Sequence, residues 1–158
     1  MLNVILGVTA VLLCTYFGRK ITARYKEIYD FISAFDEFNS ALIRDVSFKK
    51  EGVIALMNQK YGNDDFNEYL QGVISAKKNH GDLPDLPQYV KGDDAFKISE
   101  YFSSIGTSYS VAETDLLRST RDELGEKKKN YRELSQKYAT LGSKLGFALG
   151  AALFIVII

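Results

Sequence analysis

The last eighteen residues constrain this chain more than any other stretch. Residues 141–158, with the sequence LGSKLGFALGAALFIVII, carry a single charged side chain, that of Lys144. About 17 to 25 predominantly apolar residues suffice for a helix to cross the hydrocarbon core of a bilayer. Five basic residues precede this run within the segment 127–137. The pattern predicts a transmembrane helix at 141–158, and we expect the chain to stop inside or just across the bilayer.

The first eighteen residues repeat this design at the other end. Residues 1–18 contain no charged side chain, and basic residues follow directly at 19, 20, 24 and 26. A cleaved signal peptide would place its basic residues before the apolar run rather than after it. The order therefore predicts a second transmembrane helix at 1–18. The alternative for both ends is a helix buried in a protein core, which the flanking basic residues disfavour.

The distribution of charge predicts one topology. The net charge is +2 over residues 1–50, −7 over residues 51–126 and +5 over residues 127–158, and it sums to zero. Because basic residues flank spans on the cytoplasmic side, we expect both termini outside and a cytoplasmic helical domain at 19–140. A zero net charge gives no signature of nucleic-acid binding.

Two long helices are expected to continue inward from the anchors. In the first, apolar residues recur in the alternating spacing of a helix-pairing seam, at Ile21, Tyr25, Ile28, Ile32, Phe35, Asn39, Leu42 and Val46. It is predicted to run to about Phe48, and Asn39 is a polar insert that could set the pairing register or lie at the seam's edge. The last helix opens with the capping-box pattern Ser110-Val-Ala-Glu113. Its seam runs from Leu117 through Leu124 to Leu145, weakened at Thr120 and Lys127.

The middle of the chain reads as short helices separated by breaks. We expect a first short helix over Gly52–Tyr61. A second should begin after a cap at Asn63 or Asp64, and a third after a cap at Asp93 or Asp94. The second should end near His80, and prolines make the link at 82–88 stiff. The expected apolar faces are Phe66, Tyr69, Leu70, Val73 and Ile74 in one, and Phe96, Tyr101, Phe102 and Ile105 in the other. The predicted fold is all-α: short helices on a long antiparallel two-helix stalk with a membrane anchor at each end.

Residues suited to catalysis or metal binding are few. Cys14 is the single cysteine and His80 the single histidine. The carboxylate pairs Asp64-Asp65 and Asp93-Asp94 could serve a metal or acid/base site, but their position before helical patterns favours a role at helix N-termini. No phosphate-binding glycine loop or zinc-ligand spacing is present. We therefore expect no enzyme activity and no cofactor.

Small residues recur every four positions in both predicted spans. They are Ala10, Cys14 and Gly18 at one end and Gly142, Gly146 and Gly150 at the other. Small residues at this spacing let transmembrane helices approach closely. The pattern predicts helix packing through these positions, and its alternative is the ordinary tolerance of membrane helices for glycine.

The end of the chain also carries a family resemblance. Leu145, Gly146 and Phe147 precede a Gly150-containing aliphatic tail, and Ile105-Gly106 precedes the last helix. With the N-terminal span and basic flank, this resembles the stage III sporulation protein AB family. The first helix is more aromatic than is usual there, at Tyr25, Tyr29, Phe31, Phe35 and Phe38. The resemblance implies a domain like the cytoplasmic part of type II secretion F platform proteins.

The resemblance also implies a function. It predicts a non-catalytic platform in a membrane complex between mother cell and forespore, on the mother-cell side, beside a cytoplasmic secretion-type ATPase. The expected partners are membrane lipid, other membrane components, that ATPase and further copies of the chain, with no nucleic acid. The alternative is a small two-span pore-forming or regulatory membrane protein. The acidic middle predicts a partner with a basic face, contacting Asp64, Asp65, Glu68, Asp93, Asp94 and Glu100.

Overall fold

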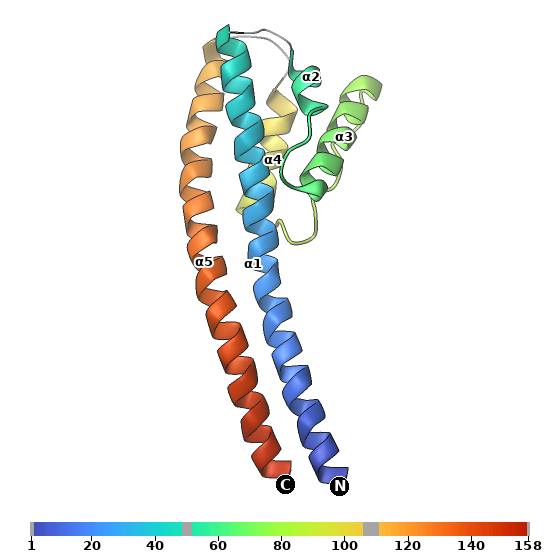
Figure 1. The fold of residues 1–158 in the computed structure, drawn as a ribbon. Helices are drawn as coiled ribbons and strands as arrows, with labels where there is room; N and C mark the ends of the chain where they lie inside the picture. The colour runs from blue at the N-terminus through green and yellow to red at the C-terminus, as the bar shows by residue number, and fades with distance from the viewer. Residues whose placement is uncertain (1, 49–51, 106–110, 158) are drawn as a thin grey trace. The chain divides into compact units, whose positions relative to one another are not determined.

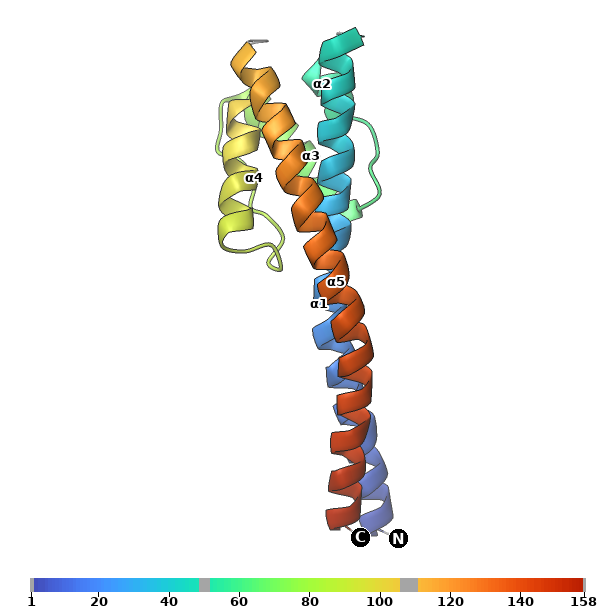
Figure 2. The same ribbon diagram turned by 90° about the vertical axis from the view of Figure 1, so that its left-hand side faces the viewer.

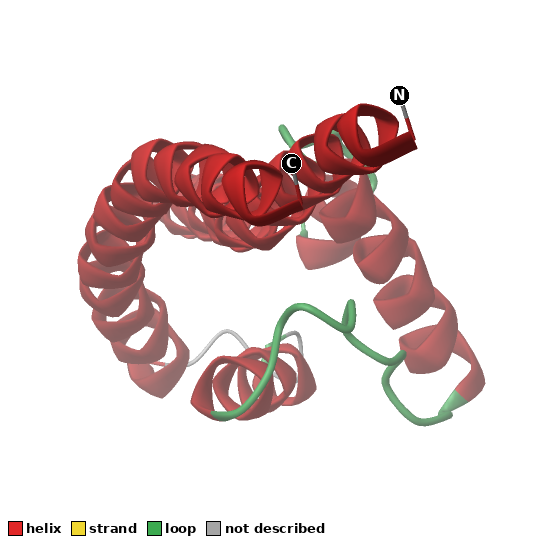
Figure 3. Ribbon diagram, turned by 90° about the horizontal axis from the view of Figure 1, so that it is seen from below, coloured by secondary structure: helices red, strands yellow, loops and turns green. Residues whose placement is uncertain are grey.

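The computed structural model describes residues 2–48, 52–105 and 111–157. These residues form five α-helices: α1 (Leu2–Phe48), α2 (Val53–Met57), α3 (Asp64–Asn79), α4 (Asp93–Ser104) and α5 (Val111–Ile157) (Figure 1). The described ranges contain no strand (Figure 3). The all-α prediction is confirmed, as are the two long helices, each of 47 residues. Ser110 of the predicted capping box lies outside the described residues.

The chain divides into two compact units. Residues 1–29 and 129–158 form the terminal unit, and residues 30–128 form the central unit. The division falls within α1 and within α5, so each long helix contributes to both units. Each unit has its own packing and is described separately below.

The terminal unit is an antiparallel pair of helical segments. The outer ends of α1 and α5 lie side by side in both views (Figures 1 and 2). The rings of Tyr25 and Tyr138 stack between the two segments, with centroids 4.7 Å apart and planes 7° from parallel. The predicted antiparallel pairing is therefore present here. Over the described residues, no helix combines the length and the apolarity needed to cross a membrane.

The central unit is organised around an aromatic core. Phe31 and Phe38 of α1, Phe66 of α3 and Phe102 of α4 are all fully buried. Ring centroids lie 5.2 Å apart for Phe31 and Phe66, and 5.6 Å apart for Phe38 and Phe102. The first pair is edge-on and the second is stacked, and such ring contacts stabilise beyond the apolar area they bury. The unusual aromatic content of the first helix thus supplies the core that joins α1, α3 and α4.

The buried face of α1 is wider than the predicted seam. The seam residues Ile28, Ile32, Phe35, Asn39 and Leu42 are buried as expected. A second stripe is buried as well, comprising Phe31, Ala34, Phe38, Ala41 and Asp45. A helix packed against neighbours on more than one side must bury more than one stripe. The side chains of Ile21 and Val46 lie outside the described residues.

Asn39 is the most deeply buried polar residue of this face. Its side-chain amide donates to the backbone carbonyl of Leu117 at 2.9 Å, and its carbonyl oxygen accepts from the Tyr101 hydroxyl at 2.7 Å. The residue has no solvent exposure. Asn39 therefore lies inside the seam and not at its edge. One side chain on α1 connects α4 and α5 through directional bonds.

The ends of α3 follow the sequence signals. The Asn63 side chain accepts from the backbone N–H of Phe66 at 2.8 Å, which is the predicted N-cap bond. His80 ends the helix in the left-handed conformation, with φ of 51°, and its backbone N–H bonds to the carbonyl of Ala76. The apolar face predicted for this helix is buried throughout.

Three details of the short helices differ from the prediction. Gly92, rather than an aspartate, occupies the N-cap of α4, and Asp93 and Asp94 lie inside its first turn. Phe96 is 68% exposed, while Ile98 is buried beside Tyr101, Phe102 and Ile105. Ile98 is the first residue of the buried stripe, which continues at the i+3, i+4 and i+7 positions. Phe96 lies about 200° around the helix from Ile98 and therefore points away from this stripe. The helix expected at Gly52–Tyr61 is also shorter, because α2 ends at Met57.

We predict that Asn39→Ala destabilises the central unit strongly. The substitution removes the bonds to the Tyr101 hydroxyl and the Leu117 carbonyl, and a hydrogen bond typically contributes about 0.5–1.5 kcal/mol. The free energy of unfolding, followed by circular dichroism during denaturant titration in detergent, measures the loss. The matched control is Asn130→Ala at an exposed position of α5, which should change stability by no more than about 0.5 kcal/mol. Equal effects of the two substitutions would contradict the role given to Asn39.

Candidate interaction surfaces

A groove runs between α3 and the proline-containing segment that follows it. Its volume is about 630 Å³, and we call it the α3 groove. One wall comes from α3 and the other from residues 84–89 of the link to α4. The lining residues are Asp65, Glu68, Tyr69, Gln71, Gly72, Ser75, Pro84, Asp85, Leu86, Pro87, Gln88 and Tyr89.

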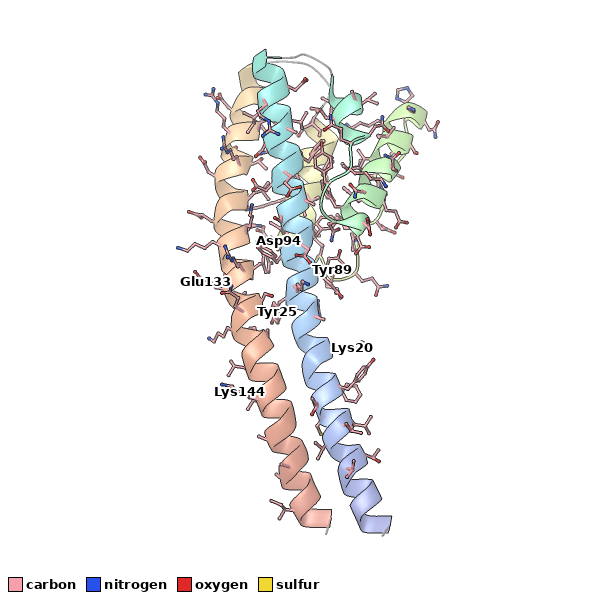
Figure 4. All side chains as sticks on the ribbon, viewed as in Figure 1. Lys20, Tyr25, Tyr89, Asp94, Glu133 and Lys144 are labelled. Carbon is pink, nitrogen blue, oxygen red and sulfur yellow. The ribbon has the colours of Figure 1, made fainter. Side chains whose placement is uncertain are left out.

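Two contacts hold the walls of the α3 groove together. A Cβ atom placed on Gly72 would lie 2.8 Å from Cγ of Pro84, so the segment packs directly on the helix backbone there. At the other end the Tyr89 hydroxyl donates to Oδ2 of Asp65 at 2.5 Å. Figure 4 shows Tyr89 on the segment between α3 and α4. A turn with the backbone N–H of Val90 bonded to the carbonyl of Pro87 at 2.8 Å orients Tyr89.

The α3 groove is acidic. Asp65 and Glu68 belong to its helical wall and Asp85 to its segment wall, and all three are exposed. No lysine, arginine or histidine lines it, and none of these carboxylates forms an ion pair within the described residues. Asp64 is also exposed, one residue before Asp65 in the first turn of α3. Three of the six predicted partner-facing acids therefore lie in or beside this groove.

A second hollow lies between α4 and α5, and we call it the α4–α5 cavity. Its volume is about 320 Å³. Its lining includes Thr120 and Lys127, the two positions where the predicted seam of the last helix is weak. Small or polar side chains at seam positions leave space that leucine would fill, which accounts for the cavity. Apolar residues of α1 and α4, including Phe35 and Ile98, form other parts of its wall.

The acids beside the α4–α5 cavity are paired with lysines. Lys127 contacts Asp94 and lies 3.2 Å from Glu123. Lys97 lies 2.8 Å from Glu123 and 3.3 Å from Asp93. Partial burial lowers the pKa of Lys127, but the bonds to Asp94 and Glu123 outweigh it and raise that pKa overall. Glu100 lines the cavity and is exposed. Asp93 and Asp94 of α4 are thus paired with lysines, whereas no ion pair of Glu100 or of the acids on α3 is found among the described residues.

Most of the small residues predicted to pack the two spans lie where their side-chain surroundings are not described. Cys14 is half-buried in the terminal unit. The side-chain surroundings of Ala10, Gly18, Gly142, Gly146 and Gly150 lie outside the described residues, so close packing through these positions stays a prediction. Among the described residues, no three His, Cys, Asp or Glu side chains gather in a way that could hold a metal ion.

Sequence reasoning did not identify the groove, although one signal was available. Gly72 interrupts the interior of an otherwise regular helix, and such a glycine often marks a close backbone approach. The two prolines of the segment predict a stiff link, but they do not predict that Pro84 packs on Gly72. The chain matches no protein-family model, no curated protein and no solved structure.

Tyr69 joins the α3 groove to the aromatic core. Its ring centroid lies 5.3 Å from that of Phe102. Its hydroxyl is buried and meets no partner at hydrogen-bonding geometry within the described residues. Burial raises the pKa of this hydroxyl to about 12, and the nearby Ser99 side chain opposes the increase.

We predict that Gly72→Ala opens the α3 groove. The new methyl group would overlap Pro84, and overpacking of this kind costs typically about 1–3 kcal/mol. Hydrogen exchange should therefore accelerate in residues 82–90, and the unfolding free energy should fall. Gly125→Ala in α5 is the matched control, since a methyl group there meets no neighbour within 4 Å. Alanine should stabilise that exposed helical position by about 0.5–1 kcal/mol. Unchanged exchange in Gly72→Ala would mean that the segment does not pack on α3 in solution.

We predict that Tyr69→Phe is neutral or stabilising and weakens the alkaline loss of stability. The substitution removes a buried hydroxyl without a partner, which is unfavourable in the folded state. The pKa of Tyr69 is about 12 in the folded protein against 10.0 normally. Because the hydroxyl ionises more readily in the unfolded chain, the free energy of unfolding is unaffected by this group below pH 10 and falls as the pH rises toward 12. Denaturant titrations across that range should show a shallower decline in Tyr69→Phe, with some decline remaining because the pKa of Tyr61 is also raised to about 12. A clear loss of stability at pH 7 would show that the hydroxyl makes a bond to Ser99.

Proposed function

We propose that the chain is a non-catalytic platform protein, anchored in a membrane by both ends, whose central unit binds other proteins. The observation that carries the proposal is the exposure of large apolar side chains on both segments of the terminal unit. Leu12 and Phe17 of α1 are 66% and 59% exposed, and Leu149 and Ile155 of α5 are 62% and 76% exposed.

Lipid is the environment that best accounts for this exposure. Fully covering a leucine or phenylalanine side chain is worth about 1.5–3 kcal/mol relative to leaving it in water, and exposed apolar surface of large extent marks protein or membrane interaction sites. Residues 1–18 offer no charged side chain to a protein partner or to water. The Thr15 hydroxyl donates to the Val11 carbonyl of its own helix at 2.8 Å, so it needs no outside partner.

Charged side chains are placed as an anchored helix requires. Lys20 and Lys144 lie at the inner ends of the two apolar runs, and both side chains are exposed (Figure 4). Lysine near the end of a span can extend its amine to the headgroups while its stem stays in apolar surroundings. Positive charge at both inner ends supports the topology with both termini outside the cytoplasm.

The sequence resemblance gives the platform its setting. Through it we propose a secretion-like sporulation complex in the mother-cell membrane facing the forespore. The partners proposed there are other membrane components, a cytoplasmic secretion-type ATPase and further copies of the chain. The all-helical central unit supports a role in binding proteins, because the carboxylates of the α3 groove are exposed and no ion pair is found for them among the described residues.

We predict that Leu12→Asp with Leu13→Asp releases the N-terminal anchor. An aspartate at the centre of a span costs about 2.5–3.5 kcal/mol, so the variant should lose part of its resistance to extraction with alkaline carbonate. Ile54→Asp with Phe96→Asp is the matched control, because both residues are exposed and apolar but lie in the central unit. It should fractionate as the parent does.

Topology provides the second measurement in that experiment. A reporter enzyme active only outside the cytoplasm should work when fused after Ile158 and be silent when inserted after Gly81. A parent chain that carbonate extracts completely, or a reporter active at Gly81, would contradict the proposed anchoring.

A further inference from the structure

We propose that the α3 groove binds a short basic segment of a partner protein, with an apolar residue beside its lysines or arginines. This deepens the platform role proposed above by stating the chemistry of one partner. It rests on that role only for the setting in which the two proteins meet. Membrane insertion is measured on other residues, so the two proposals can fail separately.

The carboxylates of the groove come from both of its walls. Asp65 and Glu68 are three residues apart on α3 and therefore share one face of that helix. Asp85 comes from the opposite wall. With no cation in the lining, a cation that enters meets negative charge on both sides. Clefts lined by one sign of charge attract oppositely charged groups and speed their encounter.

The segment wall of the groove also presents apolar side chains, which a cation alone would leave uncovered. Pro84, Leu86 and Pro87 form the segment wall together with the ring of Tyr89. Prolines have no backbone N–H, so this wall offers few donors for pairing with a partner's backbone. Recognition must then come from side chains, with basic groups at the carboxylates and an apolar group against the prolines and the ring.

The groove is held open before any partner arrives. The packing of Pro84 on Gly72 and the bond from Tyr89 to Asp65 position the segment wall. A preformed site avoids the cost of ordering a loop during binding. The aspartate that anchors Tyr89 keeps its second oxygen for a ligand, because a carboxylate has about four acceptor positions.

The α4–α5 cavity does not offer the same chemistry. Lys97 and Lys127 already occupy Asp93, Asp94 and Glu123. A basic ligand there would have to displace two lysines from existing ion pairs. Of the two hollows, the α3 groove is therefore the one with charge complementarity to a basic partner.

A defined peptide tests the proposal on the full-length chain in detergent. The probe is the fluorescent peptide Gly-Lys-Arg-Leu-Lys-Arg-Gly, and fluorescence anisotropy measures its binding at low and at physiological salt. We expect saturable binding that weakens with salt. Replacing the central leucine of the peptide by serine should weaken binding about threefold to tenfold, because an apolar contact is lost.

Charge reversal locates the binding. Glu68→Lys with Asp85→Lys should weaken the peptide about tenfold or more, since two attractions become repulsions. Asp122→Lys with Glu126→Lys is the matched control: it makes the same change in net charge at exposed residues of α5 outside the groove. The control should bind within about twofold of the parent. Circular dichroism must show unchanged helix content in both variants.

Other results would overturn the proposal. Equal weakening by the two charge reversals would show that only the net charge of the protein attracts the peptide. Binding unaffected by Glu68→Lys with Asp85→Lys, or no saturable binding at low salt, would exclude the groove. If the parent self-associates through contacts that this reversal abolishes, and the peptide does not bind, the occupant is a second copy of the chain instead.

Discussion

The central unit depends on one buried amide. Asn39 is inaccessible to water, and burying such a group is unfavourable unless its hydrogen bonds are made. It bonds to Leu117 on α5 and to Tyr101 on α4, residues 78 and 62 positions away in the chain. Any shift of one helix along another would break these bonds, whereas phenylalanine and leucine contacts tolerate small displacements. The amide therefore specifies the register in which the aromatic core packs.

That register explains the rest of the core and both hollows. With α4 held against α1, Phe35 meets Tyr101 at 4.8 Å, and Phe102 meets Phe38. With α5 held there as well, Leu117 and Leu124 are buried, and the polar residues Thr120 and Lys127 line the cavity toward α4. The α3 groove depends instead on a glycine, because only a residue without Cβ lets Pro84 lie on the helix.

Much of this fold could be predicted from local patterns, and the reasons for the failures are physical. Helical periodicity identified the long helices and the whole buried face of α3, since a stripe of five apolar residues has one interpretation. Phe96 was assigned to the core because it is large and apolar, but its angular position places it in solvent. The groove was missed because it needs Gly72 and Pro84 to meet, and no local pattern relates residues in a helix to those in a later link.

The two aspartate pairs show why charge cannot be interpreted from sequence position alone. Asp64-Asp65 and Asp93-Asp94 occupy the same place, in the first turn of a short helix, where the helix dipole favours negative charge. Their difference comes from α5, which brings Lys127 to Asp94 and leaves α3 without a comparable lysine. The consequence for binding is that Lys127 already occupies the Asp94 carboxylate, whereas no lysine pairs with Asp64 or Asp65 among the described residues. Lysines therefore pair with the carboxylates of Asp93 and Asp94, whereas those of Asp64 and Asp65 remain available to a basic partner.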